Sequence, residues 1–452
     1  MEDTIVAIST ASGVGAISII RLSGPNALEV ASSIFKGKDL KKVASHTINH
    51  GYIIDKNGSI IDEVLVSVML APKTYTTEDI VEINTHGGIA STNKVLELCL
   101  VNGARLAQPG EFTKRAFLNG RIDLTEAEAI EDVITSSTDK SLRLSMNQLT
   151  GSLKNLITEI RKDIMSLIAN IEVNIDYPEY EDAEDITLQK LKEKLLPIKS
   201  KLEELLKNSN DAKIIKDGIN ICMIGRPNVG KSSLLNAFLE EDKAIVSDIA
   251  GTTRDIVEGE TIINGIKINF LDTAGIRKTA NVVEKIGVDK SKKIINMADL
   301  IILVLNNNEK LTPDDLELLE LVKNKNYIIF VNKNDLPANI DLPDKKYANV
   351  VYGNTLTTTG IKELKEMITT LFNLEKISTN DATYITNARH KALIEVALNY
   401  LNSALENIDN SYSVDMLEID IRACWDTLGE IIGATYKDEL LDELFSNFCL
   451  GK

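Results

Sequence analysis

The sequence contains little cysteine and no long apolar segment. Its four cysteines, Cys99, Cys222, Cys424 and Cys449, are scattered along the chain with no Cys-x-x-Cys spacing. This pattern excludes a disulfide scaffold and a cysteine-rich zinc site, and it indicates a reducing cytoplasm. No apolar run approaches the ~20 residues that cross a bilayer, and the acidic start Met1-Glu2-Asp3 is unlike a signal peptide. We therefore expect a cytoplasmic protein with no membrane span.

Positive charge is also in deficit, because 50 lysines and arginines face 67 aspartates and glutamates, which gives a net charge of −17 at pH 7. Such a surface is not that of a protein that coats nucleic acid. It leaves open RNA binding through a local patch or through a partner protein. With 452 residues and an ordinary apolar fraction of 44%, the chain is expected to form roughly two to four globular domains.

Residues 225–232, Gly-Arg-Pro-Asn-Val-Gly-Lys-Ser, fit the phosphate-binding pattern G-x-x-x-x-G-K-[ST]. An apolar run of buried-strand type, residues 219–224, precedes this loop, and a helix-like run follows it. In that context the glycines let successive N–H groups and the helix N-terminus face a polyphosphate. Lys231 adds a charge on the outer phosphates, and the Ser232 hydroxyl can reach Mg²⁺. The segment therefore predicts a nucleotide-binding P-loop.

Two further nucleotide motifs follow in the expected order. The stretch Asp-Ile-Ala-Gly-Thr-Thr-Arg-Asp at 248–255 stands where a switch loop belongs, and a threonine there can close on Mg²⁺ when the terminal phosphate is present. An alternating strand then delivers Asp-Thr-Ala-Gly at 272–275. Asp272 would support Mg²⁺, and Gly275 would let the backbone meet the terminal phosphate.

The base-specifying motif follows a buried strand at 328–331, which ends in Asn332-Lys333-Asn334-Asp335. The Asp335 carboxylate can accept hydrogen bonds from N1–H and from the exocyclic amine of guanine, donors that adenine does not offer together. These ordered motifs together therefore predict a GTPase.

The group that promotes hydrolysis is not evident from these motifs. Ile276 follows Asp-Thr-Ala-Gly where small signalling GTPases have a water-orienting glutamine. Arg254 and Arg277 are nearby candidates for stabilising the transition state. Asn228 could instead hold a monovalent cation in that place, or could be an ordinary loop asparagine.

The flanking regions predict two other kinds of structure. Residues 1–120 contain short strands and helices of an α+β domain, and Glu82 lies inside an apolar strand, either on a solvated sheet face or facing a site. Residues 121–215 and 377–452 show helical periodicity, with a Thr-x-x-Glu capping box in 123–128 and Pro197 inside a long helix. By composition alone, Cys449 is typical of a free thiol in a frayed tail.

The whole chain resembles the MnmE (TrmE) family of tRNA-modification GTPases. The resemblance rests on Asp-Thr-Ile-Val-Ala at 3–7, Pro-Gly-Glu-Phe at 109–112 with its continuation to 120, Asp-Leu-Thr-Glu-Ala-Glu-Ala-Ile at 123–130, Gly-Thr-Thr-Arg-Asp at 251–255, and Phe-Cys-Leu-Gly-Lys at 448–452. The G motifs alone would fit many GTPases, whereas the terminal Cys-x-Gly-Lys box together with Pro-Gly-Glu-Phe is distinctive.

The resemblance implies a multidomain α/β plus α fold. Residues 1–120 would form an α+β domain similar to tetrahydrofolate-binding one-carbon domains, which also makes a homodimer. Residues 121–215 and 377–452 would form a helical domain on both sides of an inserted Ras-like G domain at 216–376. The implied folate-binding set, for a 5-formyl or methylene tetrahydrofolate, is Arg21, Glu82, Arg121 and Lys452, and Cys449 would be the family's functional cysteine.

The resemblance also implies the G-domain site. Asn228, Ser247, Ile249 and Thr252 would ring a K⁺ ion, Ser232 and Thr253 would hold Mg²⁺, and Glu284 would position the attacking water. The implied GTP-binding residues are Asn228, Val229, Gly230, Lys231, Ser232, Ser233, Ser247, Asp248, Ile249, Ala250, Gly251, Thr252, Thr253, Asp272, Thr273, Ala274, Gly275, Asn332, Lys333 and Asp335. The final base-contacting loop, usually Ser-Ala, is Asn354-Thr355 here.

The activity implied by the resemblance is modification of a tRNA. With an FAD-dependent partner of the MnmG (GidA) type, in a heterotetramer, such proteins add an aminomethyl or carboxymethylaminomethyl group to C5 of the wobble uridine, using a folate-borne carbon. GTP hydrolysis would drive pairing of two G domains across their K⁺ sites. The alternatives are a ribosome-assembly GTPase switch and a folate enzyme with a regulatory G domain.

Overall fold

The computed structural model describes residues 3–176, 187–241, 257–271, 294–342, 347–375, 384–436, 438–446 and 448–452. The chain divides into two compact units. The first comprises Met1–Glu131, Gln148–Lys199 and Ala392–Lys452, and the second comprises Asp132–Asn147 and Ser200–Lys391. Each unit is thus assembled from segments far apart in the sequence.

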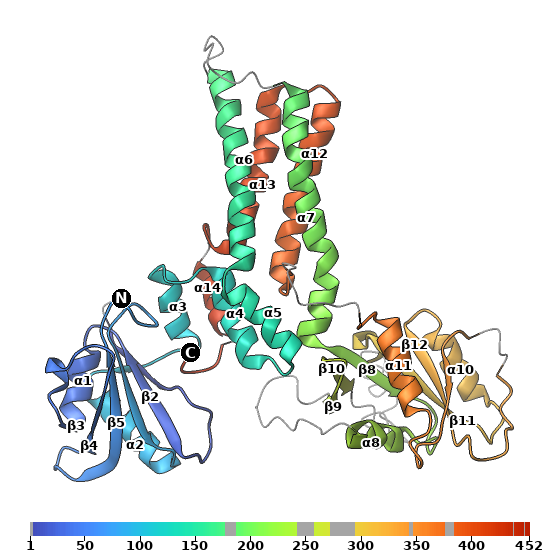
Figure 1. Ribbon diagram of the computed structural model, residues 1–452, viewed down its shortest axis with the longest axis horizontal. Helices are drawn as coiled ribbons and strands as arrows, with labels where there is room; N and C mark the ends of the chain where they lie inside the picture. Colours follow the sequence, from blue (N-terminus) through green and yellow to red (C-terminus); the bar gives the residue numbers. More distant parts are fainter. Residues whose placement is uncertain are drawn as a thin grey trace, which may run out of the picture. The chain divides into compact units, whose positions relative to one another are not determined.

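The N-terminal part of the first unit is a seven-stranded sheet with the order β3-β4-β5-β6-β2-β1-β7 (Figure 1). Neighbouring strands run antiparallel, except that β1 and β7 are parallel. The strands are β1 (Ile5–Ile8), β2 (Ile17–Ser23), β3 (Phe35–Gly37), β4 (Thr47–Ile54), β5 (Ile60–Met69), β6 (Ile80–His86) and β7 (Arg105–Leu106). The short strands expected in residues 1–120 are therefore present, and Glu82 lies in β6.

The alternation of side chains along these strands gives the sheet two different faces. One face packs on α1 (Ala27–Ile34) and α2 (Ile89–Val101), and Val6, Ile20 and Val95 are fully buried there. The short helix η1 (Leu40–Lys42) closes the edge of this core. On the opposite face, Ile5 and Ala7 lie under Phe112 of α3 (Glu111–Leu118). The two-sided burial of β1 follows from this arrangement.

The remaining helices that contribute to the first unit are α4 (Leu124–Thr135), α6 (Ser152–Asp176), α7 (Leu188–Asp217), α12 (Ala388–Asp409), α13 (Val414–Ile432) and α14 (Asp438–Ser446). The capping box of α4 differs from the one expected. Asp123 Oδ1 accepts from the Glu126 amide at 2.8 Å, and Glu126 Oε2 accepts from the Asp123 amide at 2.8 Å. Asp123, rather than Thr125, is therefore the N-cap residue, because a carboxylate two residues earlier is an equally good acceptor.

Helices α6 and α13 lie side by side (Figure 1) and are joined by a reciprocal contact. The Arg161 guanidinium lies 4.0 Å from the centre of the Trp425 ring, and its Nε donates to the Trp425 carbonyl at 3.2 Å. Trp425 Nε1 donates in return to the Arg161 carbonyl at 3.1 Å. This clasp holds together two helices that are more than 200 residues apart in the sequence.

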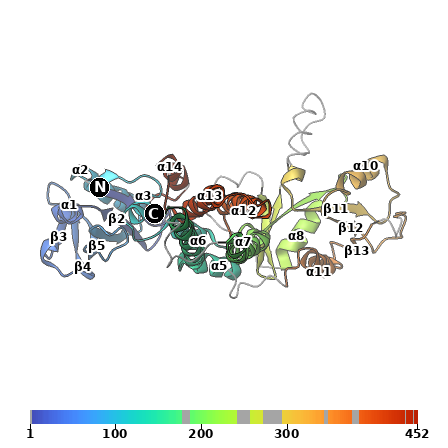
Figure 2. The ribbon, with the colours of Figure 1, turned by 90° about the horizontal axis from the view of Figure 1, so that it is seen from above.

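The second unit contains the nucleotide-binding fold. Among its described residues, strands form a sheet with the order β13-β12-β11-β8-β10-β9, parallel throughout except for the β9–β10 hairpin. Figure 2 shows this domain from above, with β11, β12 and β13 labelled. The strands are β8 (Ile219–Ile224), β9 (Val257–Ile263), β10 (Ile266–Leu271), β11 (Leu300–Asn306), β12 (Tyr327–Asn332) and β13 (Val350–Tyr352). The buried strands expected at 219–224 and 328–331 are β8 and β12.

Both faces of this sheet are covered, which explains its continuous apolar strands. Helices α8 (Lys231–Glu241) and α11 (Ile361–Leu371) contribute to one core, and α10 (Pro313–Val322) contributes to the other. Leu144 of α5 (Asp139–Leu149) and Ile215 of α7 belong to the first of these cores. The end of α7 is thus part of the same apolar cluster as the G-domain sheet. Within the described ranges, each helix is too short or too polar to span a bilayer.

Candidate functional site

The loop between β8 and α8 has the shape that its glycines require. Gly225 has φ +148°, and a Cβ there would lie 2.4 Å from the Val304 carbonyl oxygen. Gly230 has φ +103°, and its Cβ would lie 2.1 Å from Asn332 Nδ2. Only glycine fits both the dihedral angles and the space. The loop consequently wraps closely against the carboxyl ends of neighbouring strands.

The predicted phosphate ligands lie at the start of α8. Lys231 is its first residue, and Ser232 and Ser233 stand exposed in its first turn, where helical N–H groups have no intrahelical partner. Lys231 Nζ donates to the carbonyls of Gly225 and Arg226 at 2.5 and 2.7 Å. The arrangement can bind the phosphates of a nucleotide through backbone amides, with the lysine charge beside them.

Asn332 joins the P-loop to the predicted base-binding segments. Its side chain is buried, and Nδ2 donates to the Val229 carbonyl at 2.8 Å. Its Oδ1 accepts from the amides of Lys333 at 2.8 Å and Thr355 at 3.1 Å. Asp335 lies exposed a few residues further on. The Asn354-Thr355 segment, found in place of Ser-Ala, therefore lies beside the guanine-specifying motif.

Arg21 and Glu82 form the centre of a second candidate site, in the first unit. They are direct partners on the adjacent strands β2 and β6, and Arg21 Nε donates to Glu82 Oε1 at 2.8 Å. Their side chains are only 17% and 21% exposed. Of the two alternatives for Glu82, the solvated sheet face is therefore wrong, because the carboxylate is half-buried and paired.

An aromatic side chain that sequence reasoning missed joins two of the predicted residues. The Tyr75 ring centre lies 5.6 Å from the Arg21 guanidinium carbon and 4.5 Å from that of Arg121. The Tyr75 hydroxyl is 2.8 Å from Oγ1 of buried Thr113. The only sequence signal was an aromatic residue in the polar loop that precedes β6. Phe112 also faces Arg21, at 5.6 Å.

The end of the chain completes this cluster. Gly451 has φ +89°, a Cβ on it would lie 2.3 Å from the Ile8 carbonyl oxygen, and its own carbonyl accepts from Ser9 Oγ at 3.0 Å. The Lys452 carbonyl accepts from the Phe112 amide at 3.2 Å. The frayed tail suggested by composition is therefore wrong, since these residues dock on the N-terminal domain through close backbone contacts.

Lys452 lies close enough to Arg21, Glu82 and Cys449 for these groups to influence its pKa. Burial lowers the pKa of its ammonium group, the nearby Arg21 cation lowers it further, and Cys449 and Glu82 act in the opposite direction. Cys449 is exposed, whereas the other cysteines are buried, with burial raising the pKa of Cys99, Cys222 and Cys424 to about 12. Cys449 is therefore the thiol of this chain that is open to reaction.

Comparison with known proteins identifies the family of this chain. The family described as "GTP-binding protein TrmE N-terminus" matches residues 4–121, and that described as "MnmE helical domain" matches residues 124–449. The curated protein "tRNA modification GTPase MnmE" of Streptococcus pyogenes is 53% identical over 452 residues, covering 100% of this chain and 98% of the relative. The chain belongs to the MnmE family. The expectation drawn from its motifs is confirmed, and with it the prediction of a GTP hydrolase with this fold class.

Other members of the MnmE family show the same full-length agreement. The protein of that name from Ligilactobacillus salivarius is 50% identical over 455 residues, covering 100% of this chain and 98% of its own, and that from Streptococcus pneumoniae is 52% identical over 452 residues, covering 100% and 99%. Among solved structures, the G domain of the T. maritima FeoB iron transporter is 31% identical, covers 34% of this chain and 98% of its own, and has a TM-score of 0.26.

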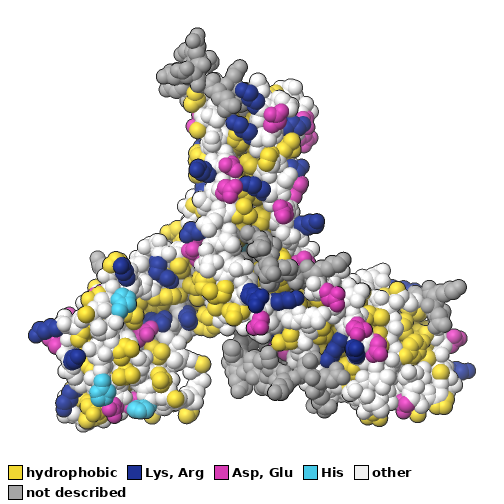
Figure 3. Space-filling view, in the orientation of Figure 1, with side chains coloured by type: hydrophobic (Ala, Val, Ile, Leu, Met, Phe, Trp, Pro, Cys, Tyr) yellow, Lys and Arg dark blue, Asp and Glu magenta, His cyan; other side chains and the backbone are white. Residues whose placement is uncertain are grey.

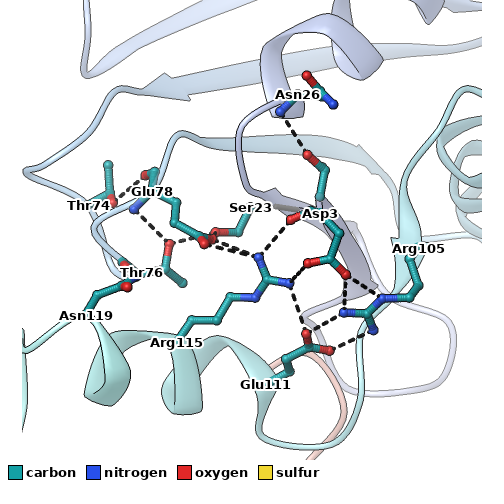
Figure 4. A network of polar contacts seen from close by, with 11 residues as sticks. Asp3, Ser23, Asn26, Thr74, Thr76, Glu78, Arg105, Glu111, Arg115 and Asn119 are labelled. Carbon is teal, nitrogen blue, oxygen red and sulfur yellow. Dashed lines mark hydrogen bonds and ion pairs between the residues drawn. The ribbon is translucent and has the colours of Figure 1, made fainter. Parts of the chain in front are cut away.

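An ion network centred on buried Arg115 supports the loop that precedes β6 in this MnmE-family chain (Figure 4). Arg115 is fully buried and contacts Asp3, Glu78 and Glu111 at 2.8, 3.1 and 3.0 Å. Glu111 also pairs with Arg105 at 2.7 Å. Burial alone would raise the pKa of Glu111, but the bonds from Arg105, the Gln108 amide and Arg115 hold it below its usual value. The network ties the N-terminus, the loop before β6 and α3 into one support.

The remaining MnmE-type predictions lie outside the described residues. These are Ser247, Asp248, Ile249, Ala250, Gly251, Thr252, Thr253, Asp272, Thr273, Ala274, Gly275 and Glu284. Asn228 is described: it has φ +64° and is exposed in the P-loop. In the part of the chain that the structure describes, no three His, Cys, Asp or Glu side chains are grouped to hold a metal ion.

Proposed function

We propose that this MnmE-family chain couples GTP hydrolysis to modification of the wobble uridine of certain tRNAs. With an FAD-dependent partner of the MnmG (GidA) type it would add an aminomethyl or carboxymethylaminomethyl group at C5, using a carbon carried by tetrahydrofolate. The observation that carries the proposal is the docking of the terminal Cys-Leu-Gly-Lys on the N-terminal sheet beside Arg21 and Glu82. A GTPase that served only as a switch would not need such a site.

The residues of the second site fit a folate. Glu82 offers a carboxylate acceptor to the N–H groups of a pterin ring, while Arg21, Arg121 and Lys452 offer cations to the carboxylates of the glutamate tail. Tyr75 and Phe112 supply aromatic faces beside the guanidinium groups. A bound folate would supply the one-carbon unit. Cys449, whose thiol is exposed, would take part in the chemistry at the tRNA base.

The proposed ion requirements of the GTPase rest on the P-loop. The Ser232 hydroxyl, in the first turn of α8, would hold Mg²⁺ together with Thr253. Asn228 would contribute its amide oxygen to a K⁺ site with Ser247, Ile249 and Thr252, which would place a positive charge near the departing phosphate. Glu284 would position the attacking water.

We further propose a homodimer that joins with the FAD-dependent partner as a heterotetramer. The face of the N-terminal sheet opposite α1 and α2 carries exposed apolar side chains, which supports dimerisation. Ile17 of β2, Ile48 of β4 and Leu65 of β5 are 63%, 67% and 46% exposed, and hydrophobic side chains lie among polar ones on this domain in Figure 3. Exposed apolar groups of this kind are typical of an interface. The division into 1–120, 121–215, 216–376 and 377–452 remains our proposal for the functional domains.

The proposal is tested by nucleoside mass spectrometry of bulk tRNA from cells with and without this chain. We expect loss of a C5-modified wobble uridine when the chain is absent and its return with the unaltered gene. Cys449→Ser should fail to restore the nucleoside while keeping GTP hydrolysis. An unchanged nucleoside profile would contradict the proposal and favour a ribosome-assembly GTPase.

The ion proposal has its own test in the rate of GTP hydrolysis. Turnover in K⁺ should exceed turnover in Na⁺ at equal ionic strength, and Asn228→Ala should remove the difference. Glu284→Ala should slow hydrolysis without weakening GTP binding. Equal rates in the two salts would refute the K⁺ site.

A further inference from the structure

Arg226, the second residue of the P-loop, is held by two carboxylates from another part of the G domain. Its Nε donates to Asp315 at 2.9 Å, and its Nη2 donates to Glu309 at 2.7 Å. The Arg226 side chain is 21% exposed, Asp315 is 2% exposed and Glu309 is 48% exposed. A guanidinium fork that uses two of its nitrogens on two acceptors has little freedom to rotate.

Asp315 cannot move to follow Arg226, because it is part of a helix cap. It is the third residue of α10, its carboxylate accepts from the Thr312 amide at 3.0 Å and hydroxyl at 2.8 Å, and its own amide donates to Thr312 Oγ1. This reciprocal capping box fixes the carboxylate relative to the end of the helix. Arg226 is therefore anchored to a rigid element rather than to a loose surface group.

Glu309, the second carboxylate that holds Arg226, lies in a loop that contacts the guanine-specifying segment. Glu309 Oε1 accepts from Asn306 Nδ2 at 2.7 Å, at the end of β11. The next residue, Asn307, donates its amide to the Asn332 carbonyl at 2.9 Å and its side chain to the Leu336 carbonyl at 3.1 Å. The loop that holds Arg226 thus also contacts the guanine-specifying segment.

The backbone of Arg226 has a direct contact with the phosphate-binding lysine. Lys231 Nζ donates to the Arg226 carbonyl at 2.7 Å and to the Gly225 carbonyl at 2.5 Å. Since an ammonium group has three donors and a flexible stem, its acceptors decide where it points. One of those acceptors belongs to the residue whose side chain is anchored.

We propose that Arg226 is a positioning residue for nucleotide binding. Its guanidinium, held by Asp315 and Glu309, fixes the carbonyls that orient Lys231 toward the phosphates of the nucleotide. Arg226 does not itself need to touch the nucleotide. These contacts of Arg226 with Asp315 and Glu309, the Arg226 clamp, link the P-loop to α10 and to the loop beside the guanine-specifying segment. The phosphate-binding and base-binding parts of the site are thereby held at a fixed distance from each other.

The proposal is tested with the full chain and fluorescent GDP and GTP analogues. Arg226→Gln should weaken binding of both by about tenfold, because the loss of charge-assisted hydrogen bonds releases the loop. Glu309→Gln should weaken binding by roughly threefold with almost no change in melting temperature, since Glu309 is half-exposed. Arg226→Lys keeps the charge but not the fork and should lie between Arg226→Gln and the unaltered chain.

A double variant separates positioning from stability. Arg226→Gln leaves the Asp315 carboxylate buried without its cation, so its melting temperature should fall. Adding Asp315→Asn should restore the melting temperature but not nucleotide affinity. Lys323→Gln, which removes an exposed pair with Glu320 at the end of α10, is the matched control and should change neither. Unaltered affinity in Arg226→Gln, or recovery of affinity together with stability in the double variant, would overturn the proposal.

Discussion

At the scale of single residues, Gly230 shows how one absent methyl group shapes the nucleotide site. Its φ is +103°, and the position a Cβ would occupy is 2.1 Å from the Asn332 side-chain nitrogen that bonds the Val229 carbonyl. A side chain would both strain the backbone and push away the asparagine that joins the P-loop to the base-binding segments. The glycine and the asparagine are therefore a matched pair, although 102 positions separate them, from 230 to 332.

Gly230→Ala should weaken GTP binding by more than about tenfold, since the strained dihedral angle alone costs about 1–3 kcal/mol and the clash adds to it. Equilibrium titration with a fluorescent nucleotide measures the change. Gly265→Ala is the matched control: its φ is +76°, but the nearest atoms are those of the flexible Lys140 side chain at 3.4 Å. Equal affinities for the two variants would contradict the role assigned to the clash.

His86 and Asp62 give a second expectation at this scale. His86 Nδ1 lies 2.6 Å from Asp62 Oδ1, and this hydrogen bond, helped by the carboxylate charge, raises the pKa of His86. A raised folded-state pKa means that the pair stabilises the fold fully below the ordinary histidine pKa of 6.5 and loses that contribution as the pH rises through the folded-state value.

An NMR titration should therefore show His86 protonated to a higher pH than a free histidine. Asp62→Asn should return its midpoint toward the ordinary value, because the charge is removed while the neighbouring Ser91 can keep a hydrogen bond to the amide oxygen. His86→Gln identifies the resonance. A midpoint that does not respond to Asp62→Asn would show that the carboxylate is not the cause.

At the scale of elements, the helical region depends on specific contacts as well as on apolar periodicity. Gly429 of α13 makes room for the Arg161–Trp425 clasp, because a Cβ there would lie 3.0 Å from the Arg161 guanidinium carbon. Burial lowers the pKa of Arg161, but the group keeps its charge over Trp425. Without a side chain at 429 the guanidinium has room to lie over the Trp425 ring.

Arg161→Ala should destabilise the fold by about 1–3 kcal/mol, through loss of the cation–π contact and of the hydrogen bond to the Trp425 carbonyl. Trp425 is the single tryptophan of the chain, so its emission should shift to the red in the folded variant. Arg422→Ala is the control, on α13 with Trp425. Its partner Glu172 is 49% exposed and its partner Glu418 is 20% exposed, and the change should stay within about 1 kcal/mol because Arg422 itself is half-exposed. An unshifted emission in Arg161→Ala would refute the clasp.

At the scale of the whole molecule, the two ends of the chain build one site. Ser9 and Gly451 are hydrogen-bonded across 442 positions, and the Phe112 amide holds the Lys452 carbonyl. The G domain, which lies between these ends in the sequence, carries a separate site with its own backbone supports. The site that we propose for tRNA modification is therefore built from chain segments outside the G domain.

Removal of residues 449–452 should abolish binding of 5-formyltetrahydrofolate while GTP hydrolysis by the chain is retained, because the P-loop contacts do not include the tail. Calorimetry for the folate and phosphate release for GTP measure the two effects. Lys452→Gln keeps the backbone docking and should weaken folate binding without abolishing it. Undiminished folate affinity in the truncated chain would contradict the proposed site.

Much of the G domain follows from local sequence because its motifs are contiguous. The P-loop needs a strand, two glycines and a helix start in succession, and each of these can be recognised from residue type and order. The same holds for Asn332-Lys333-Asn334-Asp335 at the end of β12. The Arg226 clamp could not be predicted in this way, since Asp315 and Glu309 are ordinary surface-type residues until the fold places them beside the loop.

The sequence by itself determined the GTPase motifs and the family, because these depend on residue types at short fixed spacings. The tertiary structure alone decided that Glu82 is paired rather than solvated, that Tyr75 lies between two arginines, and that the terminal Gly451 and Lys452 are docked. The physical reason is that strand register and backbone packing act between residues far apart in the chain, and neither leaves a local pattern in the sequence.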